Sequence, residues 1–355
     1  MTGKRIADYG IRIGTLERGR LNRITDVPGV RVGHATVREE HSRTGVTVIL
    51  PCPENPFVHK LTAASFVQNG FGKTVGLVQI DELGTLETPI ALTNTLNTGL
   101  VADALVSYMA ERCAAEHVPL RSVNPVVGET NDSRLNDILC RKVHEAEVRR
   151  AIEEACEDFA EGDVGAGAGT VCHGLKGGIG SASRVLCIAG ETFTLGVLVQ
   201  SNHGCLEELT IRGRRIGEEI IRARRQALPP EMQDRGSIMM IVGCDLPVSD
   251  RQLRRVLKRC SVGLARCGSY LGHGSGDVMI GFTTANRMPA AGMDRILNHR
   301  ILTESALERV FYAVAEATEE AVLNSLVAAS PQTGEDGTRY DSLSEYLKGG
   351  AYDLG

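Results

Sequence analysis

The amino-acid sequence predicts a protein of the α/β (α+β) class, because both halves of the chain combine β-rich runs with amphipathic helical patterns. The apolar run 238–242 predicts a buried strand, and residues 253–267 repeat apolar side chains on one helical face. Strands that are buried on both faces need other layers over them. The pattern therefore favours either two packed sheets covered by helices or a single sheet flanked by helices.

The first 160 residues predict four short strands and two helices. Runs of β-branched and apolar residues between turns predict the strands, at residues 30–37, 45–50, 74–80 and 90–93. Leu100, Ala104 and Tyr108 recur at helical spacing and predict a helix over about residues 98–116. The strongly charged stretch 135–159 predicts a second helix.

After residue 160 the sequence predicts a Gly-rich tract followed by a strand, and then two long helices. A Gly-rich tract at 165–180 precedes an apolar strand at 193–200. Ser249 is placed to cap a helix whose apolar stripe consists of Leu253, Val256, Leu257, Cys260, Leu264 and Cys267. Thr303 is placed to cap a longer helix through Leu326, whose inward face consists of Leu307, Val310, Phe311 and Val314.

Length and composition predict one large domain over residues 1–355, because no Pro/Ser-rich linker or charge block divides the chain. A hydrophobic content of 42% supplies a core, which 4% aromatic residues and the absence of Trp make aliphatic. The net charge of −5 argues against a nucleic-acid partner. Glu218 and Glu219 interrupt the basic cluster 212–225, as expected of a solvated helix face.

The remaining compositional features predict a soluble, cytoplasmic protein. No cationic and apolar leader opens the chain, and no apolar stretch reaches the ~18–20 residues of a membrane span. Ten cysteines are scattered without metal-type spacing, and Cys260 and Cys267 fall on apolar faces. Reduced, buried thiols are therefore expected, with no membrane contact and no metal site.

A Gly-Ser pair stands directly before the apolar strand 238–242. A serine at the start of a strand, preceded by the least hindered residue, suits a chain that cuts itself between Gly236 and Ser237. Cleavage would give Ser237 a free α-amine beside its hydroxyl, so that one residue supplies both general base and nucleophile. The Gly-Ser pair by itself is a weak signal, because most such pairs are ordinary turn residues.

A second serine cluster, Gly-His-Gly-Ser-Gly-Asp at 272–277, leads into another apolar strand at 278–282. Ser275 and Asp277 share one face of an extended segment, because side chains two apart in a strand point the same way. Two serines and a carboxylate thus begin two strands. By itself the second cluster is equally compatible with a tight turn.

Several segments, taken in order along nearly the whole chain, carry a specific resemblance. They are ITDVPGVRVGH at 24–34, PIALTNT at 89–95, VVGET at 126–130, GLKGGIGSASR at 174–184, VQSN at 199–202 and the two serine clusters. On these segments the chain resembles the L-aminopeptidase/D-esterase family. That family includes the β-peptidyl aminopeptidases and shares a superfamily with ornithine acetyltransferase.

The resemblance implies an αββα sandwich, in which two packed sheets are covered by helices. It implies autocleavage into an α chain of residues 1–236 and a β chain of residues 237–355, with strand edges of both chains in the active site. Ser237 is then the nucleophile. The residues matching Ser275 and Asp277 orient the amine of that serine in the family.

Two further residues take roles from the resemblance. Asn202 ends an apolar strand, and its amide would donate to the oxyanion that forms in acyl transfer, a contact worth ~3–4 kcal/mol at the transition state. Glu129 follows the apolar approach 125–128, and its family counterpart binds the substrate N-terminus. Without the resemblance, Asn202 can equally be a turn or cap residue. Glu129 can be a surface carboxylate near a helix that Asp132 or Ser133 caps.

The chain departs from the family at two positions. Many relatives carry an aromatic residue where this chain has Asn131, which changes the expected shape of the substrate pocket. His273 stands where some relatives have an asparagine. We expect it to be a hydrogen-bonded histidine in a loop. The Gly-rich tract 165–170 lacks the Gly-Lys-Ser/Thr of a phosphate loop, so close backbone packing explains its glycines.

The leading interpretation is a self-processing serine aminopeptidase with an N-terminal nucleophile, Ser237, and no cofactor. Its substrates would be small peptides, amino-acid amides or esters, and relatives suggest a homo-oligomer of cleaved protomers. One alternative is an acyltransferase of the same superfamily, although the ornithine enzyme is expected to use threonine after its cleavage point. Another is a non-catalytic binding protein on the same fold.

Overall fold

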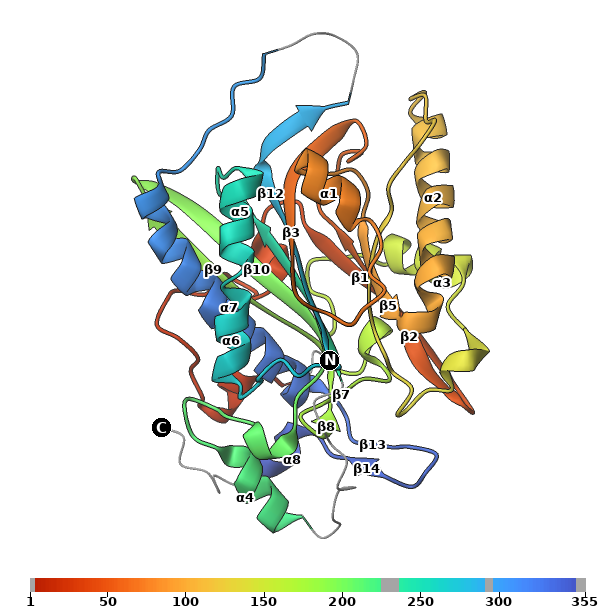
Figure 1. Ribbon diagram of the computed structural model, residues 1–355, viewed down its shortest axis with the longest axis vertical. Helices are drawn as coiled ribbons and strands as arrows, with labels where there is room; N and C mark the ends of the chain where they lie inside the picture. The colour runs from red at the N-terminus through yellow and green to blue at the C-terminus, as the bar shows by residue number, and fades with distance from the viewer. Residues whose placement is uncertain (1–3, 225–235, 291–295, 349–355) are drawn as a thin grey trace.

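Two β-sheets pack face to face, and helices cover both outer faces, in the computed structural model of the chain (Figure 1). The structure describes residues 4–224, 236–290 and 296–348. The layers are those of an αββα sandwich, so the two-sheet alternative of the sequence analysis is confirmed. No helix among these residues is long and apolar enough to span a bilayer.

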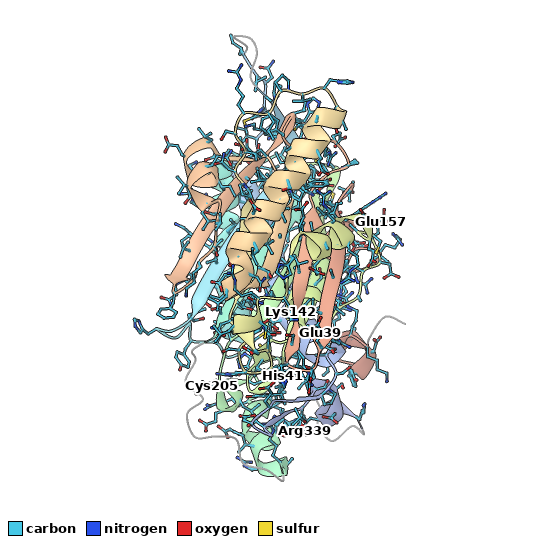
Figure 2. The ribbon with its side chains drawn as sticks, turned by 90° about the vertical axis from the view of Figure 1, so that its right-hand side faces the viewer. Glu39, His41, Lys142, Glu157, Cys205 and Arg339 are labelled. Carbon is cyan, nitrogen blue, oxygen red and sulfur yellow. The ribbon has the colours of Figure 1, made fainter. Side chains whose placement is uncertain are left out.

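The first sheet has four strands in the order β1-β2-β5-β6. The strands are β1 (Arg31–Glu39), β2 (Ser42–Leu50), β5 (Ile90–Asn94) and β6 (Val126–Thr130). Its outer face is covered by α2 (Thr98–Ala115) and α3 (Glu145–Glu153). Lys142 lies beside Glu39 near the tip of the β1–β2 hairpin, with Nζ 2.9 Å from the carboxylate (Figure 2).

The second sheet has six strands in the order β4-β3-β12-β11-β10-β9. They are β3 (His59–Gly70), β4 (Thr85–Leu86), β9 (Gly178–Ile188), β10 (Glu191–Asn202), β11 (Ser237–Cys244) and β12 (Gly276–Pro289). The parallel pair β11–β12 lies in the middle, flanked by the antiparallel neighbours β10 and β3. The outer face is covered by α5 (Asp250–Leu257), α6 (Cys260–Arg266) and α7 (Leu307–Ala328).

The remaining α-helices and strands of the described residues are short. They are the helices α1 (Leu77–Leu83), α4 (Ile216–Ala223) and α8 (Leu343–Leu347), and the strands β7 (Val171–Cys172), β8 (Leu175–Lys176), β13 (Gln332–Thr333) and β14 (Arg339–Tyr340). The two-residue turn between β7 and β8 places His173 at φ +47° and Gly174 at φ +63°. Such a turn joins antiparallel strands with the right twist.

The core between the sheets is aliphatic, as the composition predicts. Leu92 of the first sheet and Met239 of the second belong to one buried cluster. The sheets approach closely beside Gly128, where an added Cβ would lie 2.5 Å from Met239 Cε. Arg184 of β9, fully buried, pairs with Glu316 of α7 at 2.9 Å and so ties the second sheet to its covering helix.

Two expected elements are wrong. Residues 74–80 do not form a strand, because the chain turns at Gly76, with φ +93°, and enters α1 at Leu77. A short apolar run does not distinguish strand from helix. The charged stretch 135–159 is not one long helix. It contains the short 3₁₀ helix Ile138–Cys140, which the Asp137 side chain caps by accepting from the Leu139 N–H, and then α3, while the Asn136 side chain accepts from the Arg43 N–H before both.

The apolar stripe over 253–267 is buried as expected, but it belongs to two helices that meet at Lys258 and Arg259. Ser249 caps the first of them through a hydrogen bond from the Gln252 N–H. In the basic cluster, Arg222 is exposed and pairs with Glu218 at 3.4 Å, in agreement with a solvated helix face. The last residue of that cluster, Arg225, lies outside the described residues.

Candidate active site

Three strand ends meet at one edge of the second sheet. Ser237 begins β11, where it is aligned with Gly276 at the start of β12 and with Asn202 at the end of β10. The parallel arrangement of β11 and β12 brings their first residues together, and the antiparallel β10 contributes its last residue. Residues far apart in the sequence therefore converge on Ser237.

The hydroxyl oxygen of Ser237 and the carbonyl oxygen of Gly236 lie near the same hydrogen-bond donor. The Gly276 N–H lies 3.2 Å from Ser237 Oγ and 3.3 Å from the carbonyl oxygen of Gly236. Ser237 is only 6% exposed, so these groups interact with little competition from water. A donor in this position can stabilise negative charge on the Gly236 oxygen.

Gly236 passes too close to the end of β10 for any side chain. A Cβ at this position would lie 1.9 Å from the Asn202 carbonyl oxygen and 2.6 Å from His203 Cα. The glycine is therefore required by its neighbours, which is a stronger reason for it than ordinary turn chemistry.

Ser275 and Asp277 are both fully buried and lie together, as the strand spacing predicts. Ser275 Oγ donates to Asp277 Oδ1 at 2.6 Å. The side-chain amide of Asn69 donates to the carbonyl oxygens of Gly272 and Ser275 and so holds the preceding loop against β3. The hydroxyl and carboxylate flank Gly276, the residue whose N–H reaches Ser237.

Asn202 is held at both ends of its side-chain amide. Its Nδ2 donates to the Asn131 carbonyl oxygen at 2.9 Å, and its Oδ1 accepts from the Val171 N–H at 3.0 Å. It is 6% exposed and caps no helix, so its expected alternative as a turn or cap residue is wrong. Nδ2 carries a second hydrogen that can donate to a ligand.

Glu129 is buried near the end of β6, so the alternative of a surface carboxylate is wrong. Its carboxylate accepts from the Lys73 N–H at 2.7 Å and from the Thr95 hydroxyl. A Cβ on Gly72 would lie 3.3 Å from Glu129 Oε1 and 4.0 Å from Gly276 Cα. Only Gly72, which has no side chain, therefore separates this carboxylate from the sheet edge that carries Ser237.

The two positions that depart from the family, Asn131 and His273, are both exposed but differ in their contacts. The Asn131 side chain is exposed and accepts from the Ser133 N–H, and its carbonyl oxygen is the acceptor that holds Asn202. His273 is exposed, with its ring 6.5 Å from the ring of Phe71. Backbone carbonyl oxygens of this loop, including that of His273, accept from Asn69.

The structure adds supporting residues that the sequence reasoning missed. Lys176 is fully buried, donates to the carbonyl oxygens of Gly167 and Gly177, and has its pKa lowered to about 7 by that burial. Asp132 accepts from the Thr44 hydroxyl at 2.6 Å, and burial raises the pKa of its carboxyl to about 6. A lysine within the Gly-rich segment was the available sequence signal for the first of them.

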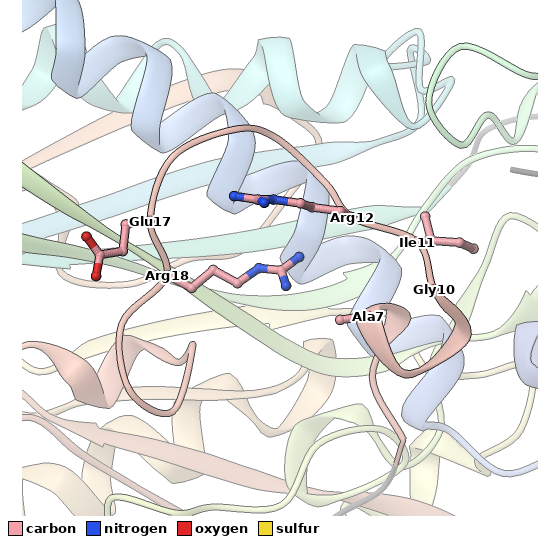
Figure 3. Close-up of a pocket in the computed structure, with 6 residues that line it drawn as sticks. All are labelled: Ala7, Gly10, Ile11, Arg12, Glu17 and Arg18. Carbon is pink, nitrogen blue, oxygen red and sulfur yellow. The ribbon is translucent and has the colours of Figure 1, made fainter. Parts of the chain in front are cut away.

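A separate open pocket of about 310 Å³ lies in the N-terminal segment (Figure 3). Its lining consists of Ala7, Gly10, Ile11, Arg12, Glu17 and Arg18. None of the residues that converge on Ser237 lines it, so the candidate active site is the strand edge and not this pocket.

Comparison with known proteins matches residues 22–340 to the family model of peptidase family S58. The chain is 36% identical to the β-peptidyl aminopeptidase BapA of Sphingosinicella xenopeptidilytica, over 98% of this chain and 92% of that protein. The match to BapA of Sphingosinicella microcystinivorans is 35% identical, over 94% of this chain and 88% of that protein.

Solved structures agree with this assignment. A β-aminopeptidase from a Burkholderia species superposes with a TM-score of 0.89 at 41% identity, covering 97% of each chain. The L-aminopeptidase D-Ala-esterase/amidase of Ochrobactrum anthropi, a serine aminopeptidase with a variant Ntn hydrolase fold, superposes with a TM-score of 0.90 at 34% identity, covering 97% of this chain and 96% of that one. These findings confirm the family resemblance and the fold, and the chain belongs to peptidase family S58.

Proposed function

We propose that this S58 peptidase is a serine aminopeptidase that first cuts its own chain between Gly236 and Ser237. The observation that carries the proposal is the Gly276 N–H, which lies within hydrogen-bond distance of both Ser237 Oγ and the Gly236 carbonyl oxygen. The nucleophile and the carbonyl that it would attack thus belong to one peptide unit, beside one oxyanion donor.

Self-cleavage proceeds through an ester. Ser237 Oγ attacks the Gly236 carbonyl carbon and loses its proton, the Gly236–Ser237 C–N bond breaks, and the nitrogen takes up a proton to become the Ser237 amine. Water then hydrolyses the ester, which leaves a carboxylate on Gly236 and a free hydroxyl on Ser237. The products are residues 1–236 and 237–355.

In turnover, the Ser237 amine takes the proton of its own hydroxyl as Oγ attacks the substrate carbonyl. The leaving amine departs with a proton, and water resolves the acyl-enzyme. The second Nδ2 hydrogen of Asn202 donates to the oxyanion, while the buried pair Ser275–Asp277 orients the Ser237 amine. An Asn202→Ala variant that is still cleaved should lose about 10²–10³ in kcat with little change in KM.

Glu129 binds the ammonium group of the substrate. Its buried carboxylate lies one glycine away from the Ser237 edge, and a charge-assisted contact there selects substrates with a free N-terminus. The relatives named β-peptidyl aminopeptidase suggest β-amino-acid residues among the substrates, besides small peptides, amides and esters. A screen of α- and β-aminoacyl p-nitroanilides measures this preference.

The central experiment is the intact mass of the purified protein and of a Ser237→Ala variant. Wild type should give the two fragments, and the variant one intact, inactive chain, because the substitution removes the nucleophile of both reactions. Ser305→Ala, an exposed serine at the start of the α7 region, serves as the matched control and should be cut and active. Cleavage of Ser237→Ala at the wild-type rate would overturn the assignment.

We also propose a homo-oligomer of cleaved protomers in the cytoplasm. The ten cysteines form no disulfide in the structure, the pattern typical of a protein from a reducing compartment. Sedimentation velocity measures the oligomer, and cell fractionation measures the location. A monomer, or secretion into the medium, would contradict the corresponding part of the proposal.

A further inference from the structure

The segment 71–74 crosses from the second sheet to the first, beside the edge that forms the candidate active site. It follows the last residue of β3, and Val75 at its far end exchanges two backbone hydrogen bonds with Val127 of β6, at 2.9 and 3.1 Å. Between these anchors, the Thr74 hydroxyl donates to Met239 Sδ at 3.8 Å. The segment is therefore tied to both sheets, which fixes the position of its backbone.

This segment lies against both ends of the candidate active site. The Phe71 carbonyl oxygen would lie 2.7 Å from a Cβ added to Gly276, the residue whose N–H reaches Ser237 Oγ. Two residues further on, the Lys73 N–H donates to the Glu129 carboxylate at 2.7 Å. Phe71 and Lys73 thus flank the path between the proposed ammonium site and the nucleophile.

Phe71 is open to solvent, whereas the groups that would hold the substrate are not. Phe71 is 58% exposed, against 3% for Glu129 and 6% for Ser237. A substrate that places its ammonium on Glu129 and its carbonyl carbon at Ser237, as the proposed function requires, holds its N-terminal residue between two buried groups. The leaving part, beyond the bond that breaks, therefore extends outward, toward the exposed ring of Phe71.

Two other exposed side chains stand beside this ring. The centroid of the His273 ring lies 6.5 Å from that of Phe71, at an interplanar angle of 56°. The Lys73 ammonium lies 5.0 Å from the Phe71 centroid, within the range of a cation–π contact. The Asn69 side chain holds the loop of His273 in place by donating to the Gly272 and His273 carbonyl oxygens. We call Phe71, Lys73 and His273 the rim of the site.

We propose that the rim is the subsite for the leaving residue of the substrate, and that it favours an aromatic side chain there. Such a side chain packs on the Phe71 ring at the spacing of aromatic pairs, about 4.5–7 Å, and removes apolar surface of both groups from water. His273 offers a second ring to the same group. The subsite rests on the proposed function, since the substrate path is taken from Glu129 and Ser237. It adds a preference for dipeptides whose second residue is aromatic.

Two matched substrates test the subsite. They share the N-terminal residue that the p-nitroanilide screen favours, and they end in phenylalanine amide or glycine amide. Wild type should have the higher kcat/KM for the phenylalanine amide. Phe71→Ala should lower that value about tenfold, mainly through KM, because the lost contact involves a part of the substrate that does not react. The glycine amide, which has no ring to pack, should stay within about twofold of wild type, and Phe71→Tyr should keep the aromatic preference.

Tyr312→Ala is the matched control and should hydrolyse both substrates as wild type does. Tyr312 is an exposed aromatic residue of α7, the helix on the outer face of the second sheet. The same ratio of the two kcat/KM values in wild type and Phe71→Ala overturns the subsite. So does a loss that changes with the N-terminal residue while the leaving residue is constant, because Phe71 then contacts the other side of the bond. A wild-type protein that neither cuts itself nor hydrolyses either substrate overturns the proposed function, and the subsite with it.

Discussion

Glu129 is the residue on which the proposed selectivity for free N-termini depends. Its carboxylate is buried and already accepts from Lys73 N–H and the Thr95 hydroxyl, so it is positioned before the substrate arrives. An acetylated substrate brings no ammonium and leaves this acid with fewer partners, which costs binding energy. Acetylated peptides should therefore be poor substrates.

Glu129→Gln should narrow that difference, because it weakens binding of the ammonium form more than binding of the blocked form. The quantity to measure is the ratio of kcat/KM for free and acetylated substrate, in wild type and variant. A ratio that stays the same would assign Glu129 to the fold and amine recognition to another group.

Asp132 predicts a pH dependence of stability. Burial is the main cause that raises the pKa of its carboxyl from 3.8 to about 6 in the folded protein, against opposing hydrogen bonds from Thr44 and Asn136. The folded state therefore holds a proton that the unfolded state has lost between these two pH values. The stabilising contribution is complete below pH 3.8 and is lost as the pH rises through about 6.

The free energy of unfolding of wild type, relative to Asp132→Asn, should accordingly fall by on the order of 3 kcal/mol between pH 4 and pH 7. Urea denaturation of both proteins at several pH values measures the difference, in which all other titrating groups cancel. Parallel pH profiles for the two proteins would show that Asp132 titrates normally in the folded state.

At the scale of elements, the contact between β9 and α7 depends on Gly180. An added Cβ would lie 2.0 Å from the Ala321 carbonyl oxygen and 2.5 Å from Ser325 N, both backbone atoms of α7. Because backbone atoms of a packed helix cannot rotate away, the helix would have to move off the sheet. The buried ion pairs of Arg184 with Glu316 and Glu320 resist that movement.

Gly180→Ala should therefore destabilise the protein by about 3 kcal/mol or more, at the upper end for overpacked cores. Gly99→Ala is the matched control: Gly99 is exposed in α2, nothing lies within 4 Å of its added Cβ, and alanine favours helix. Chemical denaturation of both variants tests the contrast. Equal midpoints would mean that α7 does not lie as close to β9 as described.

At the scale of the whole molecule, the proposed fragments share one sheet. β11 and β12, from residues 237–355, lie between β10 and β3, from residues 1–236. Separating the fragments would expose both edges of this central pair and open the core between the sheets, in which Leu92 packs with Met239. The cleaved protein should thus remain one body.

Size-exclusion chromatography of cleaved protein should accordingly elute both fragments in a single native peak. They should separate only in denaturant, which unfolds the common core. A native fragment of residues 1–236 that elutes alone would contradict the shared sheet.

The sequence alone was sufficient for the layered α/β architecture and the family, since both depend on local patterns. Apolar runs predicted β5, β10 and β11, and helical spacing predicted α2 and α7, because one buried face repeats along each element. The sequence patterns did not predict the conformation of two segments. A positive φ at Gly76 decided it for residues 74–80, and hydrogen bonds from backbone N–H groups to side chains decided it for residues 135–159.

Only the tertiary structure decided which distant residues meet. Strand register brings Asn202, Ser237 and Gly276 to one edge, and no local pattern encodes the order of strands in a sheet. The same assembly brings Phe71 beside Gly276 and His273. Sequence determined the chemical groups that the chain carries, whereas long-range packing determined their mutual positions, because those positions depend on contacts between segments that are remote along the chain.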